Sequence, residues 1–599
     1  MNAWREAGVL ITNKMLGELS YEGLLCPKPD ADGWLLELPG AVRYRFAARR
    51  GAFESWFVSG ATRRFGDEAA EPATDPRTLV VDARGPLGLT GLRLADVLAE
   101  LTATLANEAA RLSAAPAVDA LATMDYDRAD GRLTGHPRLV LNKGRMGFSA
   151  EDRVRYAPES GRGLRLRWLA VHPDLATFRS VPGLTAAQLL TEELGAELVA
   201  EFQAGLSASL DSCGDSGADS GARVDADRYV WMPVHPWQRD EIVGTLYAAE
   251  LASGALIDLG ESIDLYLPHQ TIRTLANTSH PTRRDVKTAL SVRNTLVYRG
   301  LASGATLAGP AVTDWLTAVN ARDPLLAKEY RFELLGEVAS VSVRHPIFGA
   351  LDALPYRFHE TLGALWREPI RARLAPGERA ISFAALPYRD RSGAAMVSQL
   401  IRRSGSRPLE WFGRVLDLTL VPLLHWLLRY GVGFCPHGQN LILILGADGL
   451  PSRVAIKDFA QGVDLLDVPI PEHAELAAAA QAEMLRWPAH LLAQSLFSSV
   501  FTGQLRFLAE ILLDDFAVSR TSFWDVVRQT VREYRDAHPD LASRFDACRL
   551  FDAEVEKVCL NTEHLAGQGF DKVDRDEDFD VRRGMVRNPL HGPDPGGAW

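Results

Sequence analysis

Cysteine is scarce in this sequence, and its spacing excludes two common kinds of site. The chain of 599 residues has five cysteines, Cys26, Cys213, Cys435, Cys548 and Cys559. No two form the Cys-x-x-Cys pair of a structural zinc site, and an odd, scattered set does not fit a disulfide framework. Reduced thiols of a cytoplasmic protein fit this pattern best.

An excess of basic residues is also absent, which argues against a nucleic-acid partner. Lys and Arg number 65 and Asp and Glu number 77, so the formal net charge is −12. A protein that binds nucleic acid through its whole surface normally carries the opposite sign. A local basic pocket is still compatible with this balance.

Long uncharged apolar segments are missing too, and this excludes a membrane span at the sequence level. The most apolar stretch, "VLDLTLVPLLHWLLRYGVGF", contains Asp417, Pro422, His425 and Arg429. Because a membrane helix needs about 20 nearly uncharged residues, we expect a buried core helix here. The N-terminus, "MNAWREAGVLITNKMLGEL", lacks the basic start, apolar core and cleavage site of an export signal.

The remaining composition and patterning predict an α+β protein. Apolar residues make up 47% and charged residues 24% of the chain, as in ordinary globular proteins. Helical spacing begins at Thr90 or Asp96, strand patterns dominate residues 226–300, and helical patterns dominate from Ser340. The Gly-, Ser- and Asp-rich stretch from Ser209 to Asp227 predicts a flexible loop. We therefore expect a mixed or antiparallel sheet core with a largely helical C-terminal part.

The stretch from Phe434 to Gly462, "FCPHGQNLILILGADGLPSRVAIKDFAQG", predicts a β-hairpin. "NLILIL" and "RVAIKDF" form the strands, and "GADGLPS" between them holds the turn formers Asp-Gly and Pro. Antiparallel pairing then brings Asn440 and Asp458 together at the open end. An amide oxygen beside a carboxylate suits Mg²⁺ that is shared with phosphate oxygens.

Two other interpretations of this hairpin stay open. Buried Asn and Asp side chains often cap turns without binding anything. A protein kinase also holds its metal with an Asn and an Asp, but no Asp near His437 could accept a hydroxyl proton here. The chain also lacks Gly-x-Gly-x-x-Gly and Gly-x-x-x-x-Gly-Lys-Ser/Thr motifs. If ATP binds, side chains must hold its phosphates.

Basic and hydroxyl side chains between Gln270 and Gly300 are the candidates for that task. They alternate with apolar strand positions, which predicts a lined cleft: Thr271, Arg273, Lys287, Thr295 and Arg299. Arginine offers phosphate or carboxylate a planar fork of donors, and lysine a compact charge. Arg283 and Arg284, by contrast, lie in a loop and are predicted to be exposed.

Two further clusters carry weaker signals. In the stretch from Gly135 to Glu159, glycines flank a basic loop with His136, Lys143 and Arg145. Such a loop suits an acidic ligand, or is a plain surface turn. His235 stands between two prolines with tryptophans nearby, and we expect a structural role for it.

Taken in order, these segments resemble the NRPS-independent siderophore synthetases, the aerobactin-synthetase-like family. The matching pieces are "GHPRLVLNKGRMGF", "PVHPWQ", "TIRTL…VKTALSVRNTLVYR" and "PHGQN…KDF". The resemblance runs from about residue 130 to the "NPL" near the end of the chain. It implies a three-domain cupped hand: a thumb-like domain at 1–125, a fingers-like domain at 126–370 and a palm-like domain at 371–599.

The resemblance also implies roles for individual residues. Thr271, Arg273, Lys287 and Arg299 would hold the nucleotide phosphates, with Gln439 near the ribose. His437 would lie near the α-phosphate and, with Arg299 and Lys287, act in catalysis. His136, Thr295 and Arg299 would face the carboxylate substrate, and Asn440 and Asp458 would coordinate Mg²⁺.

Two positions depart from the family pattern. A His-Pro-x-His-Pro loop is common in the family, whereas Leu139 and Val140 replace the second pair here. Many members have Glu two residues before the hairpin His, where this chain has Cys435. Because isolated cysteines are usually buried and inert, we expect Cys435 to be neither nucleophile nor ligand.

The activity that the resemblance implies is an AMP-forming ligation with ATP and Mg²⁺ as cofactors. A carboxylate, typically of citrate or a citrate derivative, attacks the α-phosphorus, pyrophosphate leaves, and an amine or alcohol takes the acyl group. Cations offset the repulsion between the two anions. A kinase-like phosphotransferase and a non-catalytic binding protein of the same fold are the alternatives. No nucleic-acid or membrane partner is expected; homodimers are common in the family, and the sequence does not fix the oligomeric state.

Overall fold

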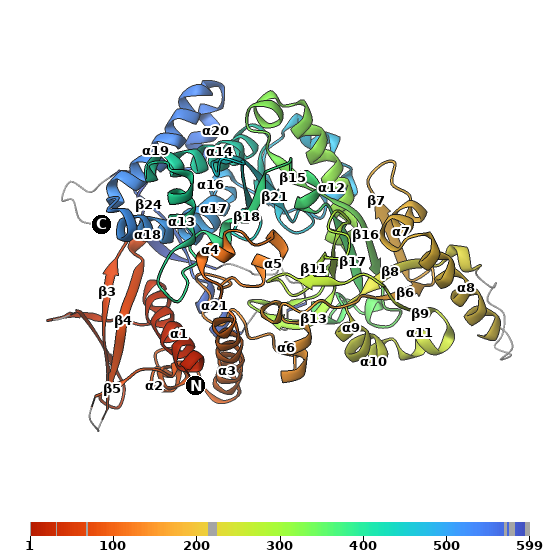
Figure 1. Cartoon of the computed structure of the whole chain (residues 1–599), viewed down its shortest axis with the longest axis horizontal. Helices are drawn as coiled ribbons and strands as arrows, with labels where there is room; N and C mark the ends of the chain where they lie inside the picture. Colours follow the sequence, from red (N-terminus) through yellow and green to blue (C-terminus); the bar gives the residue numbers. More distant parts are fainter. Residues whose placement is uncertain are drawn as a thin grey trace.

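The computed structural model shows an α+β architecture of helices and several separate sheets (Figure 1). It describes residues 2–31, 33–66, 70–213, 225–567, 572–573 and 581–592. The red and orange N-terminal part lies at one end, beside the blue C-terminal helices, and the yellow and green middle part extends to the other end. The predicted α+β class with mixed and antiparallel sheets is confirmed.

The N-terminal part packs two long helices against an antiparallel sheet. The helices are α1 (Asn2–Tyr21) and α3 (Gly91–Ser113), and Thr90, one of the two predicted starts, is the N-cap residue of α3. The sheet has the order β1-β2-β3-β4-β5, with strands Lys28–Asp30, Gly33–Leu38, Val42–Arg50, Trp56–Phe65 and Glu71–Pro72. Alternating apolar residues of these elements form one core with the helices.

The middle part contains the strands that carry the predicted basic residues. Its larger sheet is antiparallel with the order β10-β11-β12-β17-β16-β7, made of Tyr266–Pro268, Thr274–Asn277, Asp285–Thr288, Gly363–Arg367, Glu337–Val343 and Ala176–Ser180. A second sheet, β8-β6-β9, comprises Val230–Val234, Arg167–Val171 and Leu256–Glu261. The hairpin β13 (Leu290–Asn294) and β14 (Val297–Arg299) extends from this region. The strand-rich prediction for residues 226–300 is therefore confirmed.

The C-terminal part surrounds a four-stranded sheet with helices. The sheet order is β15-β21-β20-β18, from Glu333–Leu335, Pro451–Lys457, Leu441–Leu445 and Arg379–Ser382, and only β15 and β21 run parallel. Helix α14 (Pro408–Arg429) packs against strand β21, and helix α19 (Arg520–Ala537) packs on α14. Helix α18 (Arg506–Phe516) and the π-helical turn η12 (Phe497–Leu505) contribute to the same hydrophobic core. Strand β15 lies within the predicted fingers-like domain, which ends at residue 370, whereas the other three strands lie within the predicted palm-like domain. The two predicted domains therefore share this sheet, and the three-domain division stays a prediction.

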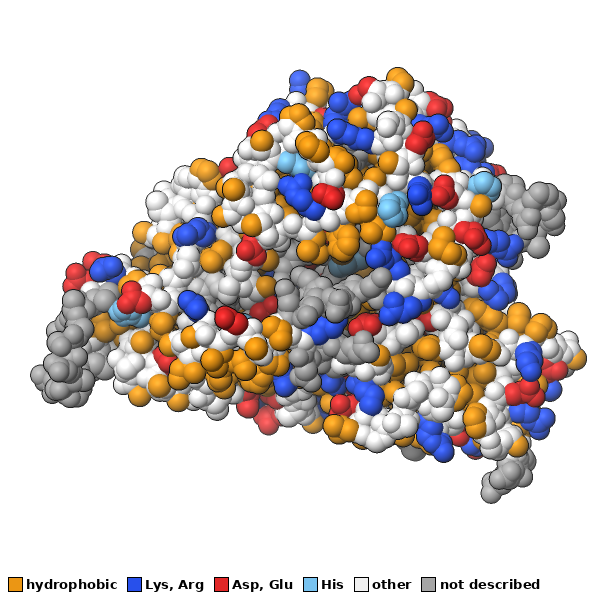
Figure 2. Space-filling model, turned by 180° about the vertical axis from the view of Figure 1, so that it is seen from behind, with side chains coloured by type: hydrophobic (Ala, Val, Ile, Leu, Met, Phe, Trp, Pro, Cys, Tyr) orange, Lys and Arg blue, Asp and Glu red, His pale blue; other side chains and the backbone are white. Residues whose placement is uncertain are grey.

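Two helical segments are long and apolar enough to span a membrane by length and composition alone. They are Pro408–Arg429 and Ala489–Phe516, and 83% and 78% of their most apolar windows are buried inside the fold. The first contains Val415–Arg429 of the stretch predicted to be a buried helix, and for this part the prediction is confirmed; the last residues of the stretch, Val432–Phe434, form strand β19 instead. On the face shown in Figure 2, basic and acidic side chains are interspersed.

One loop prediction is partly wrong. Residues 209–213 complete helix α8 (Ala196–Cys213), because its apolar spacing continues to that point. Residues 214–224 of the predicted loop lie outside the described residues.

Candidate active site

The predicted hairpin is confirmed as strands β20 and β21. Leu441 pairs with Ile456 in antiparallel register, and the Lys457 amide donates to the Asn440 carbonyl at 3.2 Å. Asp458 follows directly, so Asn440 and Asp458 both lie at the open end. Pro451 begins β21 and is not part of the turn.

Asp458 has an unusual backbone conformation for a residue with a side chain. Its φ is +79°, in the left-handed region that glycine normally occupies. The next two amides, of Phe459 and Ala460, both donate to one carboxylate oxygen of Glu337, at 3.0 and 2.7 Å. A Cβ on Gly462 would stand 2.2 Å from the Asp458 carbonyl oxygen, so only glycine fits at that position.

Lys287 on β12 forms an ion pair with Asp458. The distance from Nζ to Oδ1 is 2.5 Å, and the two side chains are 5% and 28% exposed. Burial lowers the pKa of Lys287 below its usual value, although Asp458 opposes that shift. Burial also disfavours the Asp458 anion, but Lys287 outweighs it and holds the pKa of Asp458 well below the usual range. Each group thus favours the charged form of the other.

Arg273 lies near both members of this pair, and Arg299 lies near His437 and His136. Arg273 is buried and donates to the Gly300 carbonyl and, at 3.4 Å, to Gln461, which lies three residues after Asp458. Arg299 donates to the hydroxyl of Thr295, whose φ of +60° marks the tight β13–β14 turn. The structure thus ties the basic stretch of residues 270–300 to the hairpin. Thr271 uses its hydroxyl as an acceptor for the Thr274 amide at 3.3 Å.

His437 and His136 belong to the same electrostatic neighbourhood. Burial lowers the pKa of His437 to about 4; Asp458 opposes this shift, and Lys457 and Arg299 add to it. Burial lowers the pKa of His136 well below its usual value, and nearby cations, including Arg299 and His437 when protonated, lower it further. The Nδ1 atom of His136 accepts amides of its own turn, so only the other ring nitrogen can meet a ligand. Both imidazoles are neutral at pH 7.

The remaining residues of the hairpin loop also lie at its open end. The Asn440 side chain donates to the Cys435 carbonyl at 3.0 Å, which leaves its amide oxygen for another partner. Within the described part of the chain, no hydrogen bond is formed by the half-buried Gln439 side chain. Cys435 as a residue is exposed, contrary to the expected burial, but its thiol points into the site, where burial and then the negative charges of Asp458 and Asp464 raise its pKa to about 12.

The predicted acid-binding role of Lys143 and Arg145 is wrong. Both side chains are 1% exposed. Lys143 bonds Glu108 at 2.9 Å, and Arg145 binds Glu159 through two hydrogen bonds of 2.6 and 2.8 Å. Because their charges are already used inside the fold, these cations join the basic loop to helix α3 and to Glu159.

Three minor predictions have mixed outcomes. His235 is fully buried and accepts the Trp237 amide at 3.1 Å, which confirms a structural role. Arg283 and Arg284 are half-buried, contrary to the predicted exposure, because they pair with Asp264 and Glu193 at 2.7 and 2.8 Å.

Sequence patterns missed two residues of this region. Glu337 opens strand β16 and is fully buried, and burial raises its pKa while Lys287 lowers it. A charged residue at the head of the apolar strand "EVASVSV" was the available signal. Lys14 of α1 donates to the His136 carbonyl at 2.6 Å, and nothing in the local sequence pointed to that contact.

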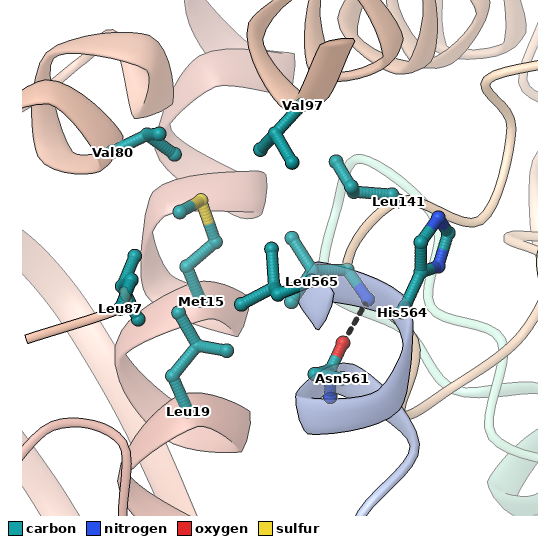
Figure 3. Close-up of a pocket in the computed structure, with 10 residues that line it drawn as sticks. Met15, Leu19, Val80, Leu87, Val97, Leu141, Asn561, His564 and Leu565 are labelled. Atoms are coloured by element: carbon teal, nitrogen blue, oxygen red, sulfur yellow. Dashed lines mark hydrogen bonds between the residues drawn. The ribbon is translucent and has the colours of Figure 1, made fainter. Parts of the chain in front are cut away.

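A small apolar cavity lies outside this region (Figure 3). Side chains of α1, α3 and α21 (Leu560–Ala566), including Met15, Val97 and Leu565, point toward one another around it. Its volume of about 10 Å³ is enough for about one water molecule. This cavity is a packing gap of the N-terminal core.

Comparison with known proteins places this geometry in a family. The IucA / IucC family matches residues 125–388, and the family described as ferric iron reductase FhuF-like transporter matches residues 409–570. The rhizobactin siderophore biosynthesis protein RhbF of Rhizobium meliloti (strain 1021) is 33% identical, with 98% of this chain and 96% of that protein covered. Putrebactin synthase of Shewanella sp. (strain MR-4) is 34% identical, with 98% and 91% covered. The citryl-spermidine/3,4-dihydroxybenzoyl-citryl-spermidine:spermidine ligase of Bacillus anthracis is 27% identical over 71% of this chain and 68% of its own.

Solved structures share the whole architecture. Aerobactin synthetase IucC from Klebsiella pneumoniae aligns with a TM-score of 0.83 and 29% identity, covering 99% of each chain. The FhuF-like segment is therefore part of the same synthetase fold. ATP-bound aerobactin synthetase IucA from the same organism has the same fold, with a TM-score of 0.73, 18% identity, and 98% and 99% of the chains covered.

The fold, together with the charged open end of the β20–β21 hairpin (the hairpin mouth), defines a siderophore synthetase of the NRPS-independent class. The chain belongs to the IucA / IucC family.

Proposed function

We propose that this protein is an ATP-dependent, AMP-forming ligase that activates a carboxylate of citrate or a citrate derivative and joins it to an amine or alcohol. The observation that carries the proposal is the Lys287–Asp458 ion pair at the open end of the hairpin, with Arg273 near both members of the pair and Arg299 near His437. Support comes from the family, from the ATP-bound member of the same fold, and from the relative whose name records a citryl-spermidine ligase.

In this proposal the basic stretch holds the nucleotide. Lys287, Arg273 and Arg299 face the phosphates, because ATP adds several negative charges to a region where cations outnumber free carboxylates. The Thr271 hydroxyl contributes a donor, and the Gln439 amide, which has no partner within the described residues, binds the ribose.

The hairpin mouth fits Mg²⁺ through its oxygen atoms. One oxygen of Asp458 and the amide oxygen of Asn440 have no hydrogen bond to the described part of the protein, and both are hard ligands. No three His, Cys, Asp or Glu side chains within the described ranges are grouped to hold a metal by themselves. The phosphates and water would therefore complete the coordination, and the ion would neutralise phosphate charge when bound.

The carboxylate substrate would meet His136, Thr295 and Arg299. Arg299 offers it a charged donor fork, and the Thr295 hydroxyl lies within hydrogen-bond reach of the same guanidinium. In this proposal the acid lies near His437, on the side of the α-phosphate. A carboxylate oxygen then attacks the α-phosphorus, and the bond to pyrophosphate breaks.

The second step transfers the acyl group. The amine or alcohol attacks the acyl carbon of the mixed anhydride, and AMP leaves with the electron pair of the broken C–O bond. Lys287 and Arg299 stabilise the departing charge in both steps. Because the pKa of His437 is about 4, its neutral ring donates or accepts a hydrogen bond without adding a charge. Positioning accounts for the amine step when the amine arrives deprotonated.

Nucleotide products separate this proposal from its alternatives. Purified protein is incubated with ATP, Mg²⁺ and a panel of citrate, 2-oxoglutarate and candidate amines. The synthetase gives AMP and pyrophosphate only when the acid is present, a kinase-like enzyme gives ADP, and a binding protein gives neither. ADP, or no turnover with any acid, would refute the proposal.

The cellular setting and assembly are part of the same proposal. We place the enzyme in the cytoplasm, where ATP is available, with small-molecule substrates as its partners. A homodimer, common in the family, is the proposed assembly, and the mass of the protein in solution tests it.

A further inference from the structure

Glu337 occupies a position that simple packing does not explain. Its side chain is fully buried, and one carboxylate oxygen accepts the consecutive amides of Phe459 and Ala460. The other oxygen, Oε1, is buried with no hydrogen-bond partner among the described residues. A buried carboxylate with one unpaired oxygen is costly, so an apolar residue would favour stability at this place in the sheet.

The two amides that Glu337 binds follow Asp458 directly. A left-handed residue such as Asp458 needs its flanking backbone to be fixed from outside, because the conformation is unfavourable by itself. Glu337 is fixed in turn, since its own amide donates to the Thr313 hydroxyl of α12 (Ser303–Arg322) at 2.9 Å. A chain of contacts therefore runs from helix α12 through Glu337 to the turn that presents Asp458.

This chain of contacts determines where the Asp458 carboxylate points. With the next two amides held, the backbone of Asp458 keeps its left-handed conformation, and from it Oδ1 meets Lys287 at 2.5 Å. Loss of the Glu337 contact would let the turn relax toward a right-handed conformation and move the carboxylate away from the hairpin mouth.

We propose that Glu337 is a positioning residue for the nucleotide–metal site: it clamps the amides of Phe459 and Ala460 and so fixes the strained Asp458. The inference rests on the proposed function, because it assumes that Asp458 serves a Mg²⁺–ATP complex. The clamp depends on the length of the Glu337 side chain and on its ability to accept hydrogen bonds, and does not need its negative charge.

Three variants separate the effect of side-chain length from the effect of charge. Glu337→Gln keeps an acceptor oxygen at the same distance without the charge, whereas Glu337→Asp keeps the charge but is shorter by one methylene. Glu337→Ala removes both. The matched control is Asp323→Asn, which alters another buried carboxylate that accepts a backbone amide, from Leu326 at 3.0 Å, together with His425.

The test measures binding as well as turnover. The Kd of a non-hydrolysable ATP analogue is determined by calorimetry at several Mg²⁺ concentrations, and the melting temperature of each variant is recorded. We expect Glu337→Gln to stay within about threefold of the wild type, and Glu337→Asp and Glu337→Ala to bind about thirtyfold more weakly, because two hydrogen bonds are lost. Asp323→Asn should lower the melting temperature and leave the Kd unchanged.

Several outcomes would overturn the clamp. It fails if Glu337→Gln binds as weakly as Glu337→Ala, or if Glu337→Asp binds like the wild type. It also fails if all three variants only lower the melting temperature, as the control does. If Glu337→Ala does not fold, the Gln and Asp variants still decide the question. A wild type that binds the analogue but never releases pyrophosphate would refute the proposed function and leave the clamp testable by binding.

Discussion

Replacement of Asp458 by Asn tests the metal pair most directly, because the change removes one charge and almost no volume. In the structure the Asp458 carboxylate has two tasks, the ion pair with Lys287 at 2.5 Å and the proposed bond to Mg²⁺. Both weaken together in Asp458→Asn. In the matched variant Asn440→Asp, oxygen ligation is kept and a charge is added beside the same ion.

The expected loss follows from the charge that is removed. Asp458→Asn removes the formal charge of the proposed Mg²⁺ ligands, so less of the phosphate charge is offset in the transition state, and we expect a loss of about 10²–10³ in rate at limiting Mg²⁺. Asn440→Asp should lose less than about tenfold, because its ligand atom remains a hard oxygen. Asp458→Asn should also destabilise the protein by about 3 kcal/mol, the low end for a broken buried pair, since the Asp458 side chain is 28% exposed.

The assay is acid-dependent exchange of pyrophosphate with ATP over a Mg²⁺ titration, with unfolding followed by circular dichroism. Excess Mg²⁺ should restore part of the activity of Asp458→Asn, because weakened binding is offset by mass action. Full activity of Asp458→Asn at limiting Mg²⁺ would refute the reasoning. So would a crystal structure with Mg²⁺–ATP in which the Asn440 and Asp458 side chains lie more than about 8 Å apart, since metal–oxygen bonds are about 2.1 Å.

Four further predictions follow from the site. Lys287→Ala and Arg299→Ala should each lower pyrophosphate release by about a hundredfold or more, because each removes a preorganised cation; unchanged turnover in folded variants would exclude them from the site. Cys435→Ser should keep most of the activity, since a thiol with a pKa of about 12 is protonated, and a trapped acyl-thioester at this position would show the reverse. Because the pKa of His437 is about 4, the pH–rate profile should have no inflection from this group near pH 6.5. The contribution of the neutral His437 to the free energy of unfolding is complete above about pH 6.5 and declines as the pH falls toward 4. In denaturant titrations, His437→Gln should make that decline smaller. Lys143→Met should lower the melting temperature and leave the KM for the acid unchanged. A raised KM for the acid would show that Lys143 does contact the acid.

Local patterns in the sequence were enough to predict the hairpin and to bring Asn440 and Asp458 to its open end. Strand alternation and turn formers are short-range signals, and the antiparallel pairing that they predicted is the one observed. The pairing of Lys287 with Asp458 did not, because 171 positions separate the two residues. Only the fold brings such residues together.

The wrong predictions about cations have one physical cause in common. Each cation was assigned to a ligand or to solvent because the carboxylate that pairs with it is not one of its near neighbours in the sequence. The carboxylates that neutralise Lys143 and Arg145 come from elsewhere, Glu108 on helix α3 and Glu159 after the loop. The contacts of the buried carboxylate Glu337 could not be predicted from the sequence for the same reason, since its partners are backbone amides 122 and 123 positions away.

The sheet β15-β21-β20-β18 has a consequence for biosynthesis of the enzyme. Its first strand leaves the ribosome more than a hundred residues before its parallel partner, since Glu333 pairs with Ala455. During that interval Lys287 and Glu337 have been synthesised but Asp458 and the amides after it have not, so the nascent chain must keep both charges hydrated. Pairing over such distances is slow, and segments that wait for it are exposed to aggregation and proteolysis. We therefore expect the proposed nucleotide site to form in a single late step of folding, after translation has passed residue 460.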